Sequence, residues 1–334
     1  MPSDPSNRVA GTGHETRNDD TQVAAMRPRH RRVAVPHWLA VLVSDRRAAV
    51  GVGLLTFFVA LVVIGHLIWT GNAVRIGHAP QLAAPSGAHW FGTDRFGRDI
   101  FLQVINGGRS SLKVGFLVGF VVTTICVGVG ISAGYFGGWI DELLSMITNI
   151  FLVIPQLPLQ IAIASFVTFK GDSLVIGVLT LTGWPFGARV LRSQTMSIRA
   201  KDFVLAAAVA GESGTRIVWL EILPNMISLV VSTFFGATMM GITSSATLQF
   251  LGYGVDQSMS WGVILNTASN SSAALSGYWW TYIFAGMCIV LVATSMILIN
   301  FGIDAISNPR LHVQKRVMKR GPAAPAPGPR IIAA

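Results

Sequence analysis

Long apolar runs separated by short polar segments form the main pattern of this chain. Six runs dominate, at about residues 48–69, 112–136, 143–169, 174–190, 226–251 and 279–301. An α-helix rises about 1.5 Å per residue and the hydrocarbon core of a bilayer is about 30 Å thick, so a run of about 20 apolar residues crosses it. The pattern predicts an all-α integral membrane protein with six transmembrane helices.

The polar segments divide the chain into three parts. Residues 1–44 are rich in Ser, Asp, Asn, Gly and Arg, without periodicity, and predict a disordered basic extension with an interfacial helix near its end. Residues 45–310 hold all six expected spans. Residues 311–334 are rich in Pro and Ala and predict an extended tail.

One polar segment, residues 200–225, interrupts the apolar runs between the fourth and fifth expected spans. A helix is expected from Asp202 to Ala210, and Gly211 can end it because Gly adopts the αL conformation freely. Ser213 is placed to cap a second short helix, and Pro224 suits the first turn of the next. The segment predicts a helix–turn–helix outside the membrane, which we call the elbow.

A second polar segment, Thr70 to Ser111, follows the first span. Ile100 to Ile105 predicts a short interfacial helix that Asn106-Gly107-Gly108 ends. His89, Asp94 and Asp99 are metal-ligating residue types, but Arg95 and Arg98 are expected to pair with the two carboxylates first. A metal site is therefore disfavoured.

Composition supports a membrane protein. The chain is 51% hydrophobic and only 12% charged, with a mean hydropathy of +0.57, whereas a soluble domain carries about 25% charge. The net charge is +10, and 19 of the 25 Lys and Arg residues lie in the two terminal segments and around the elbow. The positive-inside rule then places both termini and the elbow in the cytoplasm. We attribute the excess to orientation and lipid contact, not to nucleic acid. Cys126 and Cys288 lie in apolar runs and are expected to be small buried hydrophobes.

Two features missing from the sequence restrict how transport through this protein could be powered. No charged residue falls in the middle of an expected span, as an ion-coupled transporter usually requires, and no P-loop motif for ATP is present. The spans do hold polar residues, which either pack helices together or line a wet, uncharged path. These candidate path-lining residues are Asn149, Gln156, Gln160, Thr233, Thr238, Thr243 and Ser244.

The elbow resembles the EAA loop of ABC-importer permeases of the dipeptide/oligopeptide/nickel family, in the positions Asp202, Phe203, Val204, Ala206, Ala207, Gly211, Arg216, Ile217, Ile222, Leu223, Pro224 and Asn225. Residues 89–99 are similar to a second family motif, and Gly183-Trp184 with Trp261-Gly262 to two more. Ala208 and Leu220-Glu221 depart from the usual basic residues. Over about residues 45–310, the chain resembles the C-type transmembrane subunit.

This resemblance implies a type I ABC importer (MetI-like) permease fold in the bacterial cytoplasmic membrane. It implies a second related permease, two ABC ATPase subunits that hold ATP and Mg, and an extracytoplasmic binding protein. The cargo would be di- or oligopeptides, with nickel chelates or haem-type compounds as alternatives. The implied ATPase-coupling residues are Asp202, Phe203, Ala206, Ala207, Gly211, Glu212, Ser213, Arg216, Leu223 and Pro224. The implied outer-face motif is Gly92, Thr93, Asp94, Gly97, Arg98 and Asp99.

An enzyme from another class was also considered. Gly211-Glu212-Ser213-Gly214 matches the nucleophile motif of rhomboid intramembrane proteases. A serine nucleophile needs a base within hydrogen-bond reach, and no histidine falls in expected spans 2 to 6. We therefore expect no catalytic residues, and no cofactor or metal bound by this chain.

Overall fold

The computed structural model describes residues 45–69, 76–77, 79–254, 259–273 and 275–307, all within one compact unit of the chain. The predicted N-terminal extension and C-terminal tail lie outside these residues. The helices, in chain order, are α2 (Arg46–Ile68), α3 (Ile100–Phe136), α4 (Gly138–Val153), α5 (Gln156–Phe166), α6 (Asp172–Arg199), α7 (Asp202–Val209), α8 (Gly214–Ile217), the π-turn η2 (Val218–Ile222), α9 (Leu223–Asn225), α10 (Ile227–Phe250), α11 (Trp261–Asn270) and α12 (Trp280–Ser307).

Five of these helices, α2, α3, α6, α10 and α12, are long and apolar enough to cross a membrane. The pair α4 and α5, bent by 92° at the break between them, makes a sixth candidate span. The described part of the chain has no β-strand beyond one isolated bridge between Thr93 and Asp99. The six-span helical prediction is confirmed, with one span broken.

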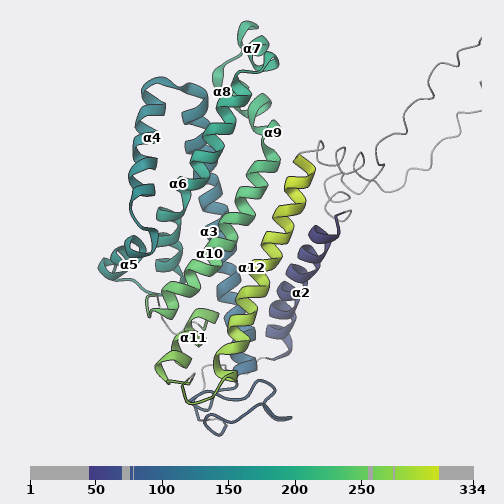
Figure 1. The fold of residues 1–334 in the computed structure, drawn as a ribbon, viewed down its shortest axis with the longest axis vertical. Coiled ribbons are helices and arrows are strands. Elements are labelled where there is room, and N and C mark those ends of the chain that lie inside the picture. Colours follow the sequence, from purple (N-terminus) through teal and green to yellow (C-terminus); the bar gives the residue numbers. More distant parts are fainter. Residues whose placement is uncertain (1–44, 70–75, 78, 255–258, 274, 308–334) are drawn as a thin grey trace, which may run out of the picture. The chain divides into compact units, whose positions relative to one another are not determined.

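Helix α3 lies at the centre, packed against α6 and α10, while α12 packs against α2 and α10 (Figure 1). Two buried apolar clusters result, one joining α3, α6 and the elbow and the other joining α2, α11, α12 and the first part of α3. Small residues permit the close approach. A Cβ added at Gly130 of α3 would lie 2.6 Å from the Ala188 carbonyl oxygen of α6. The elbow and α11 lie at opposite ends of this bundle.

The prediction that Asn106-Gly107-Gly108 ends a short helix is wrong. Helix α3 runs without a break for 37 residues from Ile100. The glycines serve packing instead, because a Cβ at Gly107 would meet Ser260 at 3.0 Å and one at Gly108 would meet Trp261 at 3.1 Å. Tertiary contacts thus outweigh the low helix propensity of glycine. Ile100, Val104 and Ile105, which were expected to face the membrane surface, are buried.

The third expected span, 143–169, is not one continuous helix. Helix α4 ends at Val153, Ile154 is extended, and α5 begins after Pro155. Proline lacks the backbone N–H that would continue the helix and disfavours the α conformation of the residue before it. Pro155 was therefore a signal in the sequence for this break in the helix.

The fourth span is longer than predicted, because α6 continues past Val190 to Arg199. Pro185 lies inside it without ending it. The Leu181 carbonyl, which the missing N–H of Pro185 would leave unpaired, accepts a hydrogen bond of 3.0 Å from Trp184 Nε1. The expected loop after the fifth span contains α11, which was not predicted.

Candidate functional site

The elbow forms two arms around a tight turn, as predicted. Helix α7 covers Asp202–Val209, and Gly211 follows with φ of +83°. The Gly211 N–H donates to the Ala208 carbonyl at 3.1 Å, and the Glu212 N–H donates to the Ala207 carbonyl at 3.2 Å. This pair of bonds is a Schellman motif, in which glycine is the favoured residue at the αL position. No heavy atom lies within 4 Å of a Cβ placed at Gly211, so the requirement for glycine comes from the backbone alone.

The second arm differs in detail from the prediction. Ser213 occupies the N-cap position of α8 but its side chain makes no capping hydrogen bond. Its hydroxyl lies 3.4 Å from the Thr215 hydroxyl instead. The chain then widens into the π-turn η2 before α9, where Pro224 takes the predicted place in the first turn.

Buried side chains anchor the elbow to the ends of the long helices. Val204, Ile217 and Ile222 are at most 2% exposed and belong to the same cluster as Ile198 at the end of α6. A Cβ at Gly214 would lie 3.0 Å from the Tyr135 ring, near the end of α3. A force applied to the elbow is therefore transmitted to α3 and α6 through packed side chains, which deform little.

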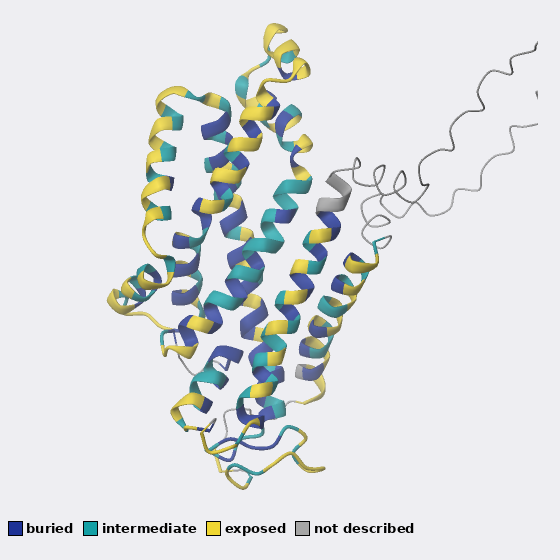
Figure 2. Cartoon of the chain, in the orientation of Figure 1, coloured by how far each residue is buried: buried dark blue, intermediate teal, exposed yellow. Residues whose placement is uncertain are grey.

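The tip of the elbow is mostly exposed (Figure 2), and several of its exposed residues are apolar. Phe203 is 38% exposed, Leu205 53% and Val209 89%. Apolar groups exposed together at the end of a helix pair mark an interaction surface. Sequence reasoning did not single out Leu205 or Val209, although their positions in an alanine-rich helix between polar residues were a usable signal.

The implied coupling residues fall into two groups. Most are exposed: Asp202, Phe203, Ala206, Gly211, Ser213, Arg216 and Pro224. Ala207, Glu212 and Leu223 are half-buried. Glu212 and Arg216 also pair with each other, at 3.4 Å between Oε2 and Nε. The set therefore combines a surface for contact with residues that fix the turn.

The rhomboid-type arrangement does not form around Ser213. The one hydrogen bond recorded for its hydroxyl in the described part of the chain is with Thr215. His89, whose side chain is described, bonds to Asp99 in the segment before α3, at the opposite end of the bundle. Among the residues that the structure describes, no histidine is in reach of Ser213 to activate it as a nucleophile.

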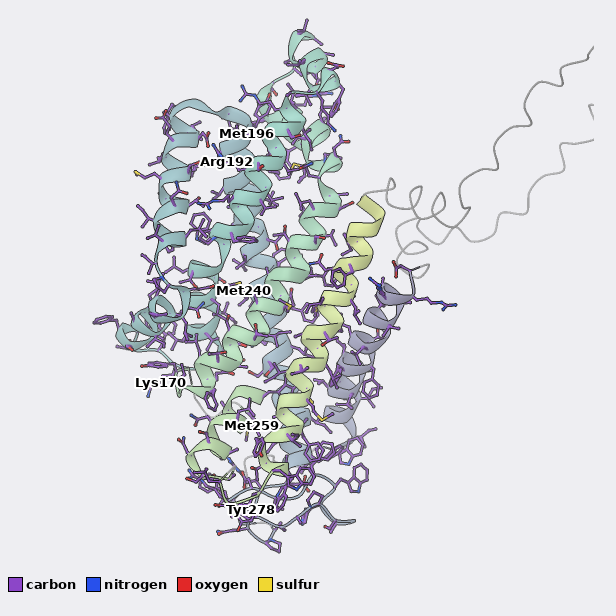
Figure 3. All side chains as sticks on the ribbon, viewed as in Figure 1. Lys170, Arg192, Met196, Met240, Met259 and Tyr278 are labelled. Atoms are coloured by element: carbon purple, nitrogen blue, oxygen red, sulfur yellow. The ribbon has the colours of Figure 1, made fainter. Side chains whose placement is uncertain are left out.

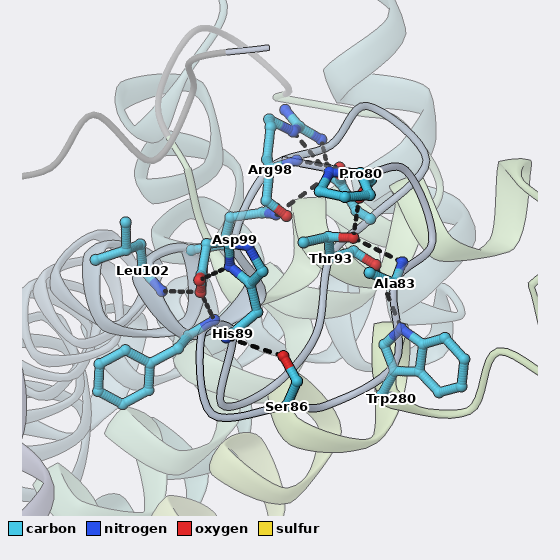
Figure 4. Close-up of polar contacts among 12 residues, drawn as sticks. Pro80, Ala83, Ser86, His89, Thr93, Arg98, Asp99, Leu102 and Trp280 are labelled. Atoms are coloured by element: carbon cyan, nitrogen blue, oxygen red, sulfur yellow. Dashed lines mark hydrogen bonds and ion pairs between the residues drawn. The ribbon is translucent and has the colours of Figure 1, made fainter. Parts of the chain in front are cut away.

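The predicted outer-face motif folds into one hydrogen-bonded network before α3 (Figure 4). The Asp94 carboxylate accepts from Arg98 Nε at 2.7 Å and from Gln103 Nε2 at 3.1 Å. The Thr93 hydroxyl donates to the Pro80 carbonyl at 2.5 Å and accepts from the Ala83 N–H at 2.8 Å. Gly92 and Gly97 have φ of +74° and +67°. The motif is thus a folded loop that holds the start of α3.

Asp99 caps α3, since its Oδ1 accepts from the Phe101 N–H at 2.8 Å. Its second oxygen lies 2.8 Å from His89 Nδ1. Asp94 pairs with Arg98 as expected, but Asp99 pairs with His89 instead of an arginine. Each carboxylate therefore has a structural role in the loop.

The candidate path-lining residues are not all on open surfaces. Gln160 is 1% exposed and donates to the Thr182 hydroxyl at 3.1 Å, and Thr238 is 0% exposed, packed against Gly119 of α3. In this conformation these two residues pack helices together. The Thr233 and Thr243 hydroxyls donate to backbone carbonyls one turn earlier. Gln156 and Ser244 line one small void between α5 and α10, and Asn149 is exposed on α4. A path along these residues stays a prediction.

Two arginines lie in the half of α6 that leads to the elbow. Arg189 lies at the end of the predicted span, and Arg192 joins the helix because α6 continues beyond Val190. Arg192 forms a bidentate pair with Asp141 of α4, at 2.5 Å from Nε and 2.7 Å from Nη2. Figure 3 shows Arg192 toward the elbow end and Met259 and Tyr278 toward the other, with Met240 between them.

Comparison with known proteins agrees with this architecture. Residues 126–312 match the family described as "Binding-protein-dependent transport system inner membrane component". The "Dipeptide transport system permease protein DppC" of Alkalihalophilus pseudofirmus is 33% identical, with 85% of this chain and 93% of that protein covered. The protein of the same name from Bacillus subtilis is 32% identical, covering 81% of this chain and 84% of that protein. The "Oligopeptide transport system permease protein OppC" of Mycobacterium bovis is 30% identical, over 72% of this chain and 81% of that one.

Solved structures of the MetNI methionine ABC transporter in inward facing conformations share the fold. One, of the native crystal form, has a TM-score of 0.52 and 22% identity, covering 63% of this chain and 97% of the other. The fold, the apolar spans and the relatives all describe a multi-pass transport component, in contrast to the protease considered above. The chain belongs to the family of inner-membrane components of binding-protein-dependent transport systems.

Proposed function

We propose that this chain is one of two permease subunits of an ATP-driven peptide importer, and that it forms half of the translocation path. The exposed apolar tip of the elbow, anchored by buried residues to α3 and α6, is the observation that carries the proposal. The relatives named above are permeases of dipeptide and oligopeptide systems. Peptides are therefore preferred over nickel chelates and haem as cargo.

The companions follow from this role. Two ABC ATPases would dock at the elbow of this chain and at that of a second, related permease, and would hold ATP and Mg. A binding protein would deliver peptide at the opposite end, where the loop before α3 lies. This chain would itself bind no cofactor.

The geometry supplies a mechanism for coupling. Closure of the ATPase dimer would displace the α7 tip, and the buried contacts of Val204 and Ile217 would pass that displacement to α3 and α6. Helix α10 would move with them, because α9 joins the elbow to it and α3 packs along it. Such packed helices switch between discrete arrangements, so the path would open alternately to each side.

The test is to purify the chain from its native membrane in mild detergent with its companions and to measure peptide uptake in reconstituted vesicles. We expect a second six-span permease and ATPases to co-purify. Gly211→Val puts a branched side chain at φ of +83°, and should lower the folded-to-unfolded ratio of the elbow by roughly fivefold, for a cost of about 1 kcal/mol. Asp202→Arg places a cation at the start of α7, where the helix dipole favours an anion. Complexes with either variant should co-purify with less of the ATPase subunits.

Gly53→Val is the matched control, because Gly53 is exposed in α2, has open space around its Cβ and has no positive φ. It should retain the ATPases and uptake. Purification of the chain alone, or normal ATPase retention by Gly211→Val, would contradict the coupling role of the elbow.

A further inference from the structure

A cavity of about 210 Å³ lies between α3, α4 and α6. Small residues, Gly130 and Ala188, form part of its wall, while Asn149, Arg189 and Arg192 give it a polar side. An ionisable residue inside a membrane-spanning segment is costly, and it usually faces an interior or a water-filled cavity that serves transport. The two arginines therefore need separate explanations.

Arg192 has its counter-ion, since Asp141 binds it through two hydrogen bonds. Arg189 has none: its recorded contact is a hydrogen bond of 2.6 Å from Nη2 to the neutral Asn149 Oδ1. No carboxylate lies within 4 Å of Arg189 in the part of the chain that the structure describes. Glu142, the other acidic residue of α4, precedes Asn149 by seven residues, or about 10 Å along the helix.

The guanidinium of Arg189 thus offers donors that the other described residues do not use. Arg189 is exposed, and an arginine has five N–H donors in a planar fork that matches a carboxylate. The hydroxyls of Ser145 and Thr148 have partners of their own within α4, because they donate to Asp141 and to the Leu144 carbonyl. The cavity is therefore suited to one oxyanion.

We propose that Arg189, held by Asn149, binds the C-terminal carboxylate of the peptide during its passage. This assignment rests on the proposed function and names the feature of the cargo that the path recognises. An open groove of about 620 Å³ runs along α4 next to Asn149, lined partly by Met146, Ile150 and Val153. A peptide with its carboxylate at Arg189 places its remaining residues along this groove.

The depth of the site favours a peptide over a lipid phosphate. Trp139 is 72% exposed at the start of α4, next to Asp141 and Glu142, and such residues mark the membrane interface. Asn149 lies about 10 Å further along α4 than Glu142. The hydrogen bond to Asn149 keeps the guanidinium at this depth, away from the level of the headgroups.

The test uses the complete membrane complex without its binding protein, in phosphatidylcholine vesicles. N-acetyl-trialanine and its C-terminal amide differ only in the terminal charge, and their affinities follow from titration of the thermal unfolding midpoint. We expect the acid to bind about tenfold more tightly than the amide to the unmodified complex. Arg189→Gln should bind both equally, and Arg189→Lys should keep part of the preference. Arg199→Gln, at the end of the same helix, should keep all of it.

Equal affinities in the unmodified complex, or a preference that survives in Arg189→Gln, would overturn the assignment. So would a midpoint shift that needs Arg189 and phosphatidylglycerol but not the acid, since the ligand would then be a lipid. Uptake of unblocked trialanine with the binding protein present separates the two proposals. Normal uptake without acid preference removes only the Arg189 site, whereas acid preference without uptake removes only peptide import.

Discussion

At the residue scale, two glycines before α3 allow the cost of backbone strain to be measured apart from the cost of a steric clash. Gly77 and Gly97 both have positive φ, of +76° and +67°. A Cβ at Gly97 would collide with the Ala79 carbonyl, whereas one at Gly77 meets nothing within 4 Å. Alanine at either site has the backbone cost of about 1 kcal/mol, but only Gly97→Ala must also displace a carbonyl.

We therefore expect Gly77→Ala to lower the thermal unfolding midpoint of the detergent-solubilised protein slightly, and Gly97→Ala to lower it much more and reduce the folded yield. Equal losses in the two variants would show that the loop yields at Ala79 without cost, and that the network around Asp94 is looser than its hydrogen bonds imply.

At the element scale, one ion pair joins α4 to α6. Asp141 and Arg192 keep 20% and 32% of their side-chain surface exposed. Their interaction therefore stabilises the protein by about 1 kcal/mol, less than the loss that follows when a buried pair is broken. Asp141→Asn and Arg192→Gln should each lower the unfolding midpoint. The double variant should lose less than the two losses combined, because each single change leaves the partner charge without its counter-ion. Strict additivity in this cycle would mean that the ion pair itself does not help to hold α4 on α6.

Local sequence signals predicted these elements unevenly. The turn at Gly211 and the placement of Pro224 were predictable, because each depends on the conformational limits of one residue. The continuity of α3 through Gly107 and Gly108 was not, since it depends on contacts with Trp261, more than 150 residues later. Pro155 and Pro185 illustrate the same limit. Proline broke the third span but not the fourth, where Trp184 and its neighbours satisfy the freed carbonyl.

The elbow was predictable because its family motif falls on one helix–turn–helix segment. The elbow positions were found from the family resemblance, and the structure adds which of them are buried. Arg189 could not be placed, because the expected span ended at Val190 and the arginine was taken as a flanking charge. The structure shows that α6 continues to Arg199 and that Arg189 bonds to Asn149 of α4.

At the scale of the whole molecule, the start of α2 and the end of α12 lie at the same end of the bundle as the elbow, with the loop before α3 at the other end (Figure 1). The distribution of Lys and Arg predicts that the elbow end lies in the cytoplasm. Single cysteines test this orientation, because Cys126 is buried and Cys288 is half-buried among apolar residues, and the unsubstituted chain gives the background. Ala88 and Ala208 are both exposed, one in the loop and one on α7.

A membrane-impermeant maleimide should label Ala88→Cys in intact cells, and Ala208→Cys only after permeabilisation. The reverse pattern would show that the elbow lies outside the cell, where the ATPases could not contact it. The same Ala208→Cys protein then reports docking, because its cysteine lies on the exposed tip of α7. In membranes that lack the ATPases it should react fully, and added ATPases should protect it while leaving Ala88→Cys reactive. Labelling of Ala208→Cys that is indifferent to the ATPases would place their contact on another surface, and the link from the elbow to α6 would then need a different role.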